Sequence, residues 1–381
     1  MKITARGLNR ATLGRQMLLQ RESLGVADAM RRVVALQAQQ PASPYLALWN
    51  RLAGFDPARL DAAFADGTVV KANQVRMTLH ATLAADYPAF REATDPSIFA
   101  ARLRDRRFSV TGMSVEAADA LVPELLAFAV ESRTADEMVA WLAERLGESP
   151  HPGVWWALRQ YSPLLRAPTG QPWSFASKTS YIAPATRPVL SNPDVAAESL
   201  KTLVWRYLEG FGPASVADVA QFALVQRSRV RAAIQALAAD LVRLEGPNGQ
   251  ELFDIPDGSL PADDTLAPPR LMAMWDNILL SYVDRSRVIP PDYRKIVIRI
   301  NGDVLPTLLV DGYVAGVWRA VEGGIEATAF HPLTDDVWER LDDEARSLVS
   351  FLAGRDPEVY RRYHHWWGKL PGGETRLLPN D

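Results

Sequence analysis

The sequence predicts an α+β protein made of three tandem winged-helix domains followed by a small C-terminal β-barrel. The order helix, helix, two-stranded hairpin occurs three times in series, and this is the plan of the winged helix, a variant of the helix-turn-helix. After the Pro-rich stretch 261–270, short apolar segments are joined by Asn-Gly and Asp-Gly turns, which predict a meander of strands. The expected domain boundaries are 1–110, 111–196, 197–262 and 263–381.

The first copy shows helical periodicity over about 9–40 and 57–66. The segment 68–83 then alternates apolar and polar residues and is rich in β-branched side chains, with a turn expected at Ala72-Asn73. The segment is therefore predicted to be the first wing.

The second and third copies repeat this order. Helices are predicted at about 114–131 and 134–146, before a hairpin over 161–177 that turns at Thr169-Gly170. In the third copy the predicted elements are a helix over 216–225 capped by Ser215, a second from Ser228 to about 239, and a hairpin with Asn248-Gly249 at its tip.

The C-terminal region is predicted to be a barrel of short strands with one covering helix. Strands are expected at 295–300, 304–310 and 313–320, and the helix at about 334–353. The tail 361–370 mixes basic and aromatic residues. Stacking on a nucleobase is conceivable for such a tail, but docking of its rings on the same domain is favoured.

Composition limits the possible classes of protein. The chain has 381 residues, of which 48% are hydrophobic and 23% charged, and it has no cysteine. Disulfides, thiolate zinc sites and a cysteine nucleophile are thereby excluded. The N-terminus has no apolar signal region, and no stretch approaches the ~20 apolar residues of a membrane span. A cytoplasmic protein without a membrane segment is predicted.

Charge and motif content exclude other classes. Lys and Arg number 42 against 45 acidic residues, for a net charge of −3, so the chain is not a bulk polycation. Arginines do cluster at 102–107 and at 227–231, although solvated helix faces are the simpler explanation. There is no HExxH, no GxSxG and no P-loop. Neither a metal nor a cofactor is predicted.

One short segment breaks the apolar stripe of the first helical region. The stripe reaches Val33 and continues not with an apolar residue but with Gln37, and Gln39 and Pro41 follow. Proline disfavours helical geometry in the residue before it, so the helix is expected to unwind near 38–40. In an extended segment two residues at i and i+2 face the same way, so both amides could enter one cleft. Amides can hold a water or steady a cation, but they cannot donate a proton as an acid.

Several segments, in this order, resemble the AlkZ/YcaQ family of bacterial DNA glycosylases. They are LQAQQPASPYLALWNRLAGFDPARL, VVKANQVRMTLHATLAADYP, YLEGFGPASVADVA, YVDRSRVI and LVDGYVAGVWR. The resemblance implies tandem winged helices with a C-terminal barrel, and excision of N7-alkylated purines, including bulky and crosslinked ones. It also implies that Gln37 and Gln39 are catalytic. The chain is more similar to the AlkZ branch, because the second motif position is glutamine rather than aspartate.

Other residues follow from the same resemblance. Thr78 and His80 match the family's Thr-Leu-His segment, and strand alternation puts both on one face. Together with Arg76 on that face and Lys71 near the expected wing tip, they are candidate DNA-binding residues. A structural role for His80 is an equal alternative. Asp284 is expected to form a structural pair with its neighbour Arg285.

The leading hypothesis is a monofunctional DNA glycosylase that acts on N7-alkylpurines in double-stranded DNA, as a monomer and without a cofactor. General alkylation repair and self-resistance to a DNA-alkylating toxin stay open as its role. The alternative is a non-enzymatic winged-helix DNA-binding protein, such as a regulator or a protein that sequesters damage. A protein-docking scaffold is the third possibility.

Overall fold

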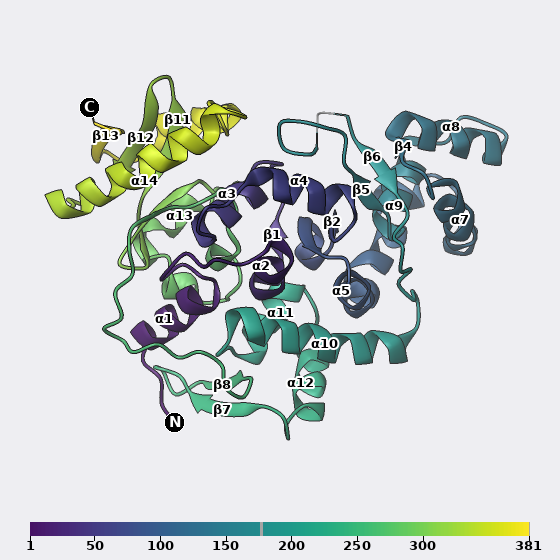
Figure 1. Cartoon of the computed structure of the whole chain (residues 1–381). Helices are drawn as coiled ribbons and strands as arrows, with labels where there is room; N and C mark the ends of the chain where they lie inside the picture. Colours follow the sequence, from purple (N-terminus) through teal and green to yellow (C-terminus); the bar gives the residue numbers. More distant parts are fainter. Residues whose placement is uncertain (176–177, 381) are drawn as a thin grey trace.

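The computed structural model describes residues 1–175 and 178–380 and has an α+β fold (Figure 1). The N-terminal region contains the following elements: α1 (Ala5–Arg15), α2 (Val26–Val33), β1 (Leu36–Gln37), α3 (Ser43–Arg51), α4 (Pro57–Ala65), β2 (Val69–Asn73), the 3₁₀ turn η1 (Val75–Met77), β3 (Leu79–Leu83) and α5 (Tyr87–Thr94). The helix predicted over 9–40 is wrong, because α2 ends at Val33. Val34 has a positive φ of 68°, which a helix does not accommodate, so the extended segment begins before residues 38–40.

The first hairpin lies inside a larger sheet rather than forming a free wing. The sheet has six strands in the order β1-β3-β2-β5-β6-β4. Its other members are β4 (Arg133–Thr134), β5 (Leu165–Ala167) and β6 (Ser180–Ile182). The turn expected at Ala72-Asn73 is wrong, since β2 continues through Asn73 and the chain turns in η1, where Arg76 and Met77 both have positive φ. The hairpins of the first two copies therefore share one sheet.

The helices of the second copy form a separate group at one end of this sheet. Its helices are α6 (Arg106–Ser109), α7 (Val115–Phe128), α8 (Ala135–Leu146) and α9 (Pro152–Tyr161). The helices predicted at 114–131 and 134–146 are confirmed, and α8 begins with a capping box between Thr134 and Glu137. The second strand of the hairpin predicted over 161–177 starts later, at Ser180. Residues 176–177 lie outside the described part of the chain.

The third copy matches its prediction most closely. After the long helix α10 (Pro193–Phe211) come α11 (Val216–Ala223), α12 (Arg227–Ala236), β7 (Val242–Glu245) and β8 (Glu251–Asp254). Ser215 and Asp218 form a capping box at the start of α11. Gly249 at the hairpin tip has a φ of 74°, a conformation that glycine adopts without steric cost. The helix-turn-helix and two-stranded hairpin thus lie where the sequence placed them.

The C-terminal region forms a second sheet with α14 packed against it (Figure 1). Its elements are β9 (Arg270–Leu271), α13 (Arg294–Val297), β10 (Thr307–Val310), β11 (Tyr313–Val321), β12 (Gly324–Ala329), α14 (Asp335–Ala353), the 3₁₀ segment η7 (Arg361–Lys369) and β13 (Glu374–Leu378). The strand predicted over 295–300 is wrong, since α13 occupies its first part. The sheet order β13-β12-β11-β10-β9 has two edges in the described residues, so a closed barrel is not confirmed.

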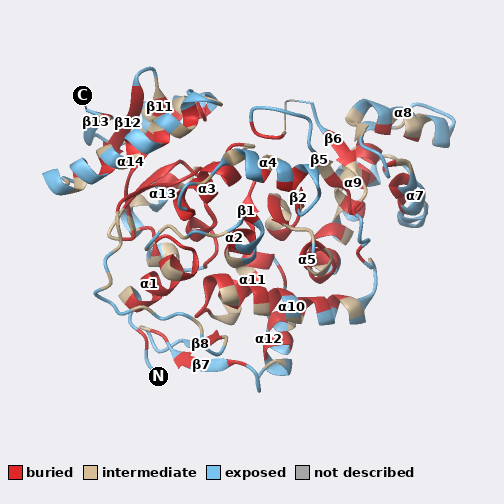
Figure 2. Ribbon diagram, in the orientation of Figure 1, coloured by how far each residue is buried: buried red, intermediate tan, exposed pale blue. Residues whose placement is uncertain are grey.

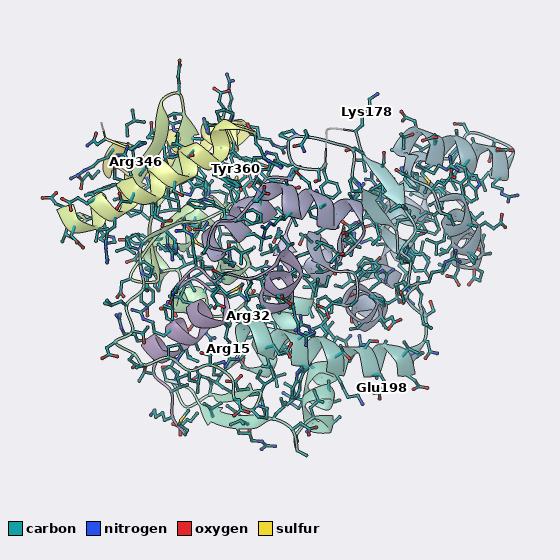
Figure 3. All side chains as sticks on the ribbon, viewed as in Figure 1. Arg15, Arg32, Lys178, Glu198, Arg346 and Tyr360 are labelled. Carbon is teal, nitrogen blue, oxygen red and sulfur yellow. The ribbon has the colours of Figure 1, made fainter. Side chains whose placement is uncertain are left out.

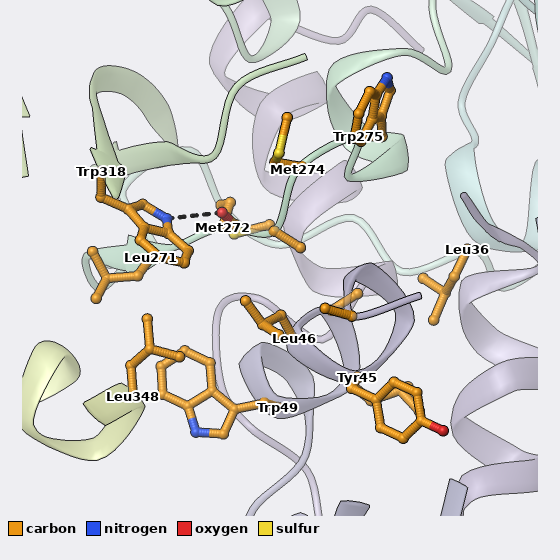
Figure 4. Packing of buried hydrophobic residues seen from close by; sticks show 14 of the residues in the cluster. Leu36, Tyr45, Leu46, Trp49, Leu271, Met272, Met274, Trp275, Trp318 and Leu348 are labelled. Carbon is orange, nitrogen blue, oxygen red and sulfur yellow. Dashed lines mark hydrogen bonds between the residues drawn. The ribbon is translucent and has the colours of Figure 1, made fainter. Parts of the chain in front are cut away.

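The largest hydrophobic core joins the two ends of the chain. Apolar residues of α2, α3 and β1 pack in one cluster with those of β9, β10, β11 and α14. Figure 4 shows this packing, in which Leu46 and Trp49 of α3 lie beside Leu271 and Leu348. Trp318 donates from Nε1 to the Met272 carbonyl at 2.9 Å. Buried residues fill the centre of the molecule, whereas α7 and α8 expose much of their surface (Figure 2).

Buried ion pairs fix the N-terminal helices against distant segments. Arg51 on α3 pairs with Asp276 at 2.7 Å, and both side chains are fully buried. Arg15, marked in Figure 3, pairs with Asp254 at 2.7 Å and donates to the Leu208 carbonyl of α10. Breaking such a pair would leave an uncompensated buried charge, so these contacts set the relative placement of the segments. In the described residues, no helix has the length and apolarity needed to cross a membrane.

Candidate active site

Gln37 lies in a polar cluster centred on Arg76. Gln37 pairs with His80 across β1 and β3, and only 5% of its surface is exposed. Nη2 of Arg76 donates to three acceptors: Gln37 Oε1 at 3.2 Å, His80 Nε2 at 3.2 Å and Asn277 Oδ1 at 3.1 Å. Asn277 in turn donates to the Ala35 carbonyl at 2.5 Å. The sequence placed Arg76 on the strand face of Thr78 and His80; it lies instead in the turn η1 before β3, and from there its side chain reaches His80.

The conformation of η1 directs Arg76 into this cluster. Arg76 has φ 55° and ψ 13°, a left-handed conformation that costs a non-glycine residue about 1–2 kcal/mol. Its guanidinium also lies 5.3 Å from the Phe222 ring of α11. The third helical copy thus forms one wall of the site around Gln37.

The charges in this cluster are unbalanced. Among the described residues Arg76 has no carboxylate partner, and burial together with Arg285 lowers its pKa to about 10, so it stays protonated near neutral pH. Burial and the Arg76 charge lower the pKa of His80 to about 3. His80 Nδ1 lies 3.0 Å from the Thr78 carbonyl, which assigns the proton to Nδ1 and leaves Nε2 as the acceptor for Arg76. His80 is neutral and cannot serve as a general acid.

Gln39 lies at the edge of β3 and is exposed. Its Oε1 accepts from the backbone N–H of Leu79 at 3.0 Å, and the N–H of Ala38 donates to the Leu79 carbonyl at 2.7 Å. The next residue, Gln40, donates to the Tyr363 hydroxyl at 2.8 Å, which anchors the motif to η7. The expected docking of the aromatic tail on its own domain is seen instead at Trp366, whose Nε1 donates to Asp303 at 2.8 Å.

Gln39 borders a hollow of about 170 Å³, here called the basic hollow. It is lined by Gln39, Pro41, Lys71, Leu79, Arg166, Ala167, Thr169, Phe175, Lys178, Thr179 and Ser180. Gln37 is not among these residues. That both amides reach one substrate therefore stays a prediction.

The structure corrects the placement of Lys71. The sequence placed it near a wing tip, but it lies within β2 between β3 and β5, with 5% of its surface exposed. Its ammonium is 4.2 Å from the centre of the Phe175 ring. Burial, with a smaller contribution from Arg166, lowers its pKa to about 7. Thr78 is half-buried and directs its hydroxyl toward the Val75 carbonyl at 3.4 Å. DNA contacts by both residues stay predictions.

The expected pair between Asp284 and Arg285 is wrong. Asp284 Oδ1 instead accepts from the Ser286 N–H at 2.9 Å and caps the short 3₁₀ turn η5 (Arg285–Arg287). No ion pair to Arg285 is present among the described residues, and the positive charge of Arg285 instead contributes to lowering the pKa of Arg76.

Sequence reasoning missed Asn277 and Arg166. Asn277 is an amide in an apolar run with no motif around it. Arg166 follows two leucines in a predicted strand, and alternation alone could have placed it on a face, but its position opposite Lys71 depends on the pairing of β2 with β5.

The chemistry available around Gln37 is that of amides, a guanidinium and a neutral imidazole. No cluster of His, Asp and Glu suited to a metal ion occurs within residues 1–175 and 178–380. An amide beside a fixed cation can orient a water molecule and place its carbonyl dipole near developing positive charge.

A family model described as DNA glycosylase AlkZ-like matches residues 30–351. The chain belongs to the AlkZ-like DNA glycosylase family. Its enzyme class is therefore that of a DNA glycosylase, and the resemblance deduced from the motifs is confirmed.

Two comparisons agree with this assignment. The chain is 23% identical over 353 residues to a protein of Streptomyces sahachiroi named interstrand DNA cross-link repair glycosylase, covering 87% of this AlkZ-like chain and 91% of the relative. It also matches the solved structure of Streptomyces sahachiroi DNA glycosylase AlkZ with a TM-score of 0.77, at 21% identity, over 92% of this chain and 96% of the other. The two proteins share a fold along nearly their whole length.

Proposed function

We propose that this AlkZ-like chain hydrolyses the N-glycosidic bond of cationic N7-alkylpurine nucleotides in double-stranded DNA, with Gln37 and Gln39 as its catalytic residues. The observation that carries the proposal is the Gln37 amide, which is held by Arg76 beside a neutral His80 and has no carboxylic acid among the described residues in hydrogen-bond contact. A site without an acid suits a base that departs without being protonated. N7-alkylation provides such a base, because the purine already carries a positive charge.

The reaction can be written with the residues present at this site. The C1′–N9 bond breaks and its electron pair goes to the purine, which leaves neutral, while the sugar develops oxocarbenium character. One lone pair of Gln37 Oε1 accepts from Arg76. The second lone pair and the amide N–H groups remain for a water molecule. The water oxygen bonds to C1′ and its proton passes to solvent. Positioning the water and stabilising the sugar cation are the two contributions asked of the amides.

The finer features of the proposal follow from the same chemistry and from the relatives. Because the attacking group is water rather than an amine, the enzyme is monofunctional, and borohydride should trap no covalent complex with DNA. The name of the Streptomyces relative extends the substrates to interstrand crosslinks. The winged-helix modules and a C-terminal barrel would hold the duplex, and the enzyme would act as a monomer at the bacterial nucleoid, in repair or in self-resistance.

Release of free base from matched duplexes tests the proposal. Duplexes that differ only in one nucleotide, N7-methylguanine, a bulkier N7 adduct or uracil, are incubated with the protein. Release of both N7-alkylguanines without uracil is expected, since uracil would have to leave as an anion or be protonated. Efficient uracil release would contradict the mechanism. Binding of the N7-methylguanine duplex without release would instead favour the non-enzymatic winged-helix alternative.

A further inference from the structure

Two cations face each other within the six-stranded sheet. Lys71 on β2 and Arg166 on β5 are directly opposite in the antiparallel register, so their side chains are on the same face of the sheet. Like charges in this arrangement destabilise a strand pair. Both residues line the basic hollow beside Gln39.

Neither cation is compensated by the described part of the protein. Lys71 is 5% exposed and makes no hydrogen bond or ion pair there, only the contact with the Phe175 ring. Arg166 lies 4.5 Å from the Tyr181 ring, and its buried Nη1 has no hydrogen-bond partner. Among the residues that the structure describes, no carboxylate lines the hollow. Burying charges without partners is costly, and perturbed charged groups in a cavity are typical of functional sites.

We infer that the basic hollow is a phosphate-binding subsite that takes a DNA phosphodiester next to the nucleotide on which Gln39 acts. This inference rests on the proposed glycosylase function, which it deepens by naming the group that anchors the substrate strand. Arg166 supplies a guanidinium edge and Lys71 a point charge, the two kinds of donor that bind phosphate oxygens. Lys178 stands at the rim, exposed and directed outward in Figure 3.

The size and position of the hollow fit one phosphate group. Its volume of about 170 Å³ is below the ~300–1,000 Å³ typical of pockets that enclose whole small molecules. Gln39 contributes to the same wall, so a strand anchored here would pass the motif. Arg76 donates its hydrogen bonds within the other cluster, to Gln37, His80 and Asn277, so the two cationic groups can act on different parts of the substrate.

The titration of Lys71 provides an independent readout. Burial, and then Arg166, bring its pKa to about 7 in the free protein. A bound phosphate stabilises the charged amine and raises this pKa, so DNA binding takes up a proton. The affinity should therefore increase as the pH falls from 9 to 7 and level off below 7.

The experiment compares Lys71→Met, Arg166→Leu and the double variant with the wild type. Lys201→Met is the matched control, because Lys201 is ion-paired with Glu198 on the exposed side of α10 and its loss changes net charge equally. Affinity for an N7-methylguanine duplex is measured by fluorescence anisotropy against salt and pH. Each single variant should lose about tenfold in affinity, and the slope of log K against log salt should fall by about 0.9 per lost contact. The pH dependence should disappear with Lys71.

Thermal melting separates a binding role from a structural one. Removing an uncompensated buried cation should leave the melting temperature of Lys71→Met equal to or above that of the wild type, whereas a structural role predicts a decrease. Added inorganic phosphate should raise the wild-type melting temperature more than that of Lys71→Met. Stabilisation by inorganic phosphate with unchanged DNA affinity in the variants would assign the hollow to a free anion and overturn the DNA role.

The outcomes separate this inference from the proposed function. If N7-methylguanine is excised but the variants bind DNA with wild-type affinity and salt slope, the subsite is wrong and the glycosylase assignment stands. If the variants lose affinity as expected in a protein that releases no base, the phosphate contact stands and the catalytic proposal fails.

Discussion

Replacing Arg76 by methionine tests how the Gln37 amide is oriented. Methionine keeps an unbranched side chain but removes the donor that reaches Gln37, His80 and Asn277. Under the proposed mechanism, Gln37 then loses its fixed orientation and the attacking water is placed less accurately. We therefore propose a positioning role for Arg76 in place of the DNA contact predicted from the sequence, and we expect slower base release with little change in DNA affinity.

The magnitude follows from the geometry. A hydrogen bond to a charged group contributes about 1.5–3 kcal/mol, but here one Nη2 serves three acceptors at 3.1–3.2 Å. The share that acts on Gln37 is thus roughly 1–2 kcal/mol, which corresponds to a rate loss of about 5- to 30-fold. Because Arg76 is a half-buried cation without a carboxylate partner in the described residues, its removal also relieves part of a desolvation cost. The melting temperature should change by only a few degrees.

Single-turnover excision of N7-methylguanine from a duplex, followed against pH, is the assay. Besides the rate loss, Arg76→Met should raise the His80 pKa above its wild-type value of about 3, since one of the two causes of the depression is removed. A new decrease in rate should appear on the acid side. Arg346→Met is the control, since Arg346 pairs with Asp342 on α14 (Figure 3) and should leave rate and profile unchanged. Excision by Arg76→Met at the wild-type rate and with the wild-type pH profile would refute the positioning role.

Three further predictions concern activity and stability. The double variant Gln37→Ala with Gln39→Ala should lose base release while keeping its fold and most of its DNA affinity, as measured by excision and anisotropy on one duplex; wild-type excision would show that the site is misassigned. The folded-state pKa of His80 is depressed from 6.5 to about 3, so its contribution to the free energy of unfolding is complete above pH 6.5 and is lost as the pH falls toward 3. In denaturant titrations this dependence should be weaker in His80→Gln, and an identical dependence would contradict the assignment. Burial alone would raise the Asp61 pKa, but hydrogen bonds, first that from Arg355, lower it to about 2. Asp61→Asn should cost about 1–3 kcal/mol of stability at neutral pH, with the difference from wild type shrinking below pH 4; equal stability at pH 7 would rule this out.

Local signals explain why the third helical copy could be predicted from the sequence. Ser215 with Asp218 caps α11, and Asn248-Gly249 supplies the turn between β7 and β8. These interactions span only a few residues, so the sequence contains both partners of each. The helices of the second copy were predictable for the same reason, as the capping box of α8 shows.

The errors arise where distant segments decide the local structure. The segment 68–83 alternates as a wing would, yet its strand β2 pairs on its second side with β5, almost a hundred residues away in sequence. The apolar segment 295–300 has the composition of a strand, but the structure makes its first part the helix α13. Short apolar runs do not distinguish helix from strand by periodicity alone.

The candidate site likewise contains residues that could be predicted from the sequence and residues that could not. Gln37, Arg76 and His80 were all identified from one short stretch of sequence and its family resemblance, and the structure places them in contact. Asn277 is supplied by a 3₁₀ turn (Asn277–Leu279) more than two hundred residues later, so no pattern near the motif could indicate it. The burial that keeps His80 neutral is likewise a property of the packed core rather than of the Thr-Leu-His segment.

The two clusters beside the motif raise one electrostatic question, because a cationic lesion should be repelled by Arg76 and by the basic hollow. The DNA resolves it, since each phosphate of the strand brings a negative charge with it. In the proposed complex, the phosphodiester neutralises Lys71 and Arg166, while the purine loses its positive charge as the C1′–N9 bond breaks. The positive charge passes to the sugar as oxocarbenium character develops there, and the carbonyl dipole of Gln37, oriented by Arg76, is proposed to stabilise it. A neutral base would have to leave as an anion or be protonated, and the described residues around Gln37 include no acid to protonate it. Under the proposed mechanism, selection of lesions by charge therefore follows from the absence of an acid among the described residues of this site.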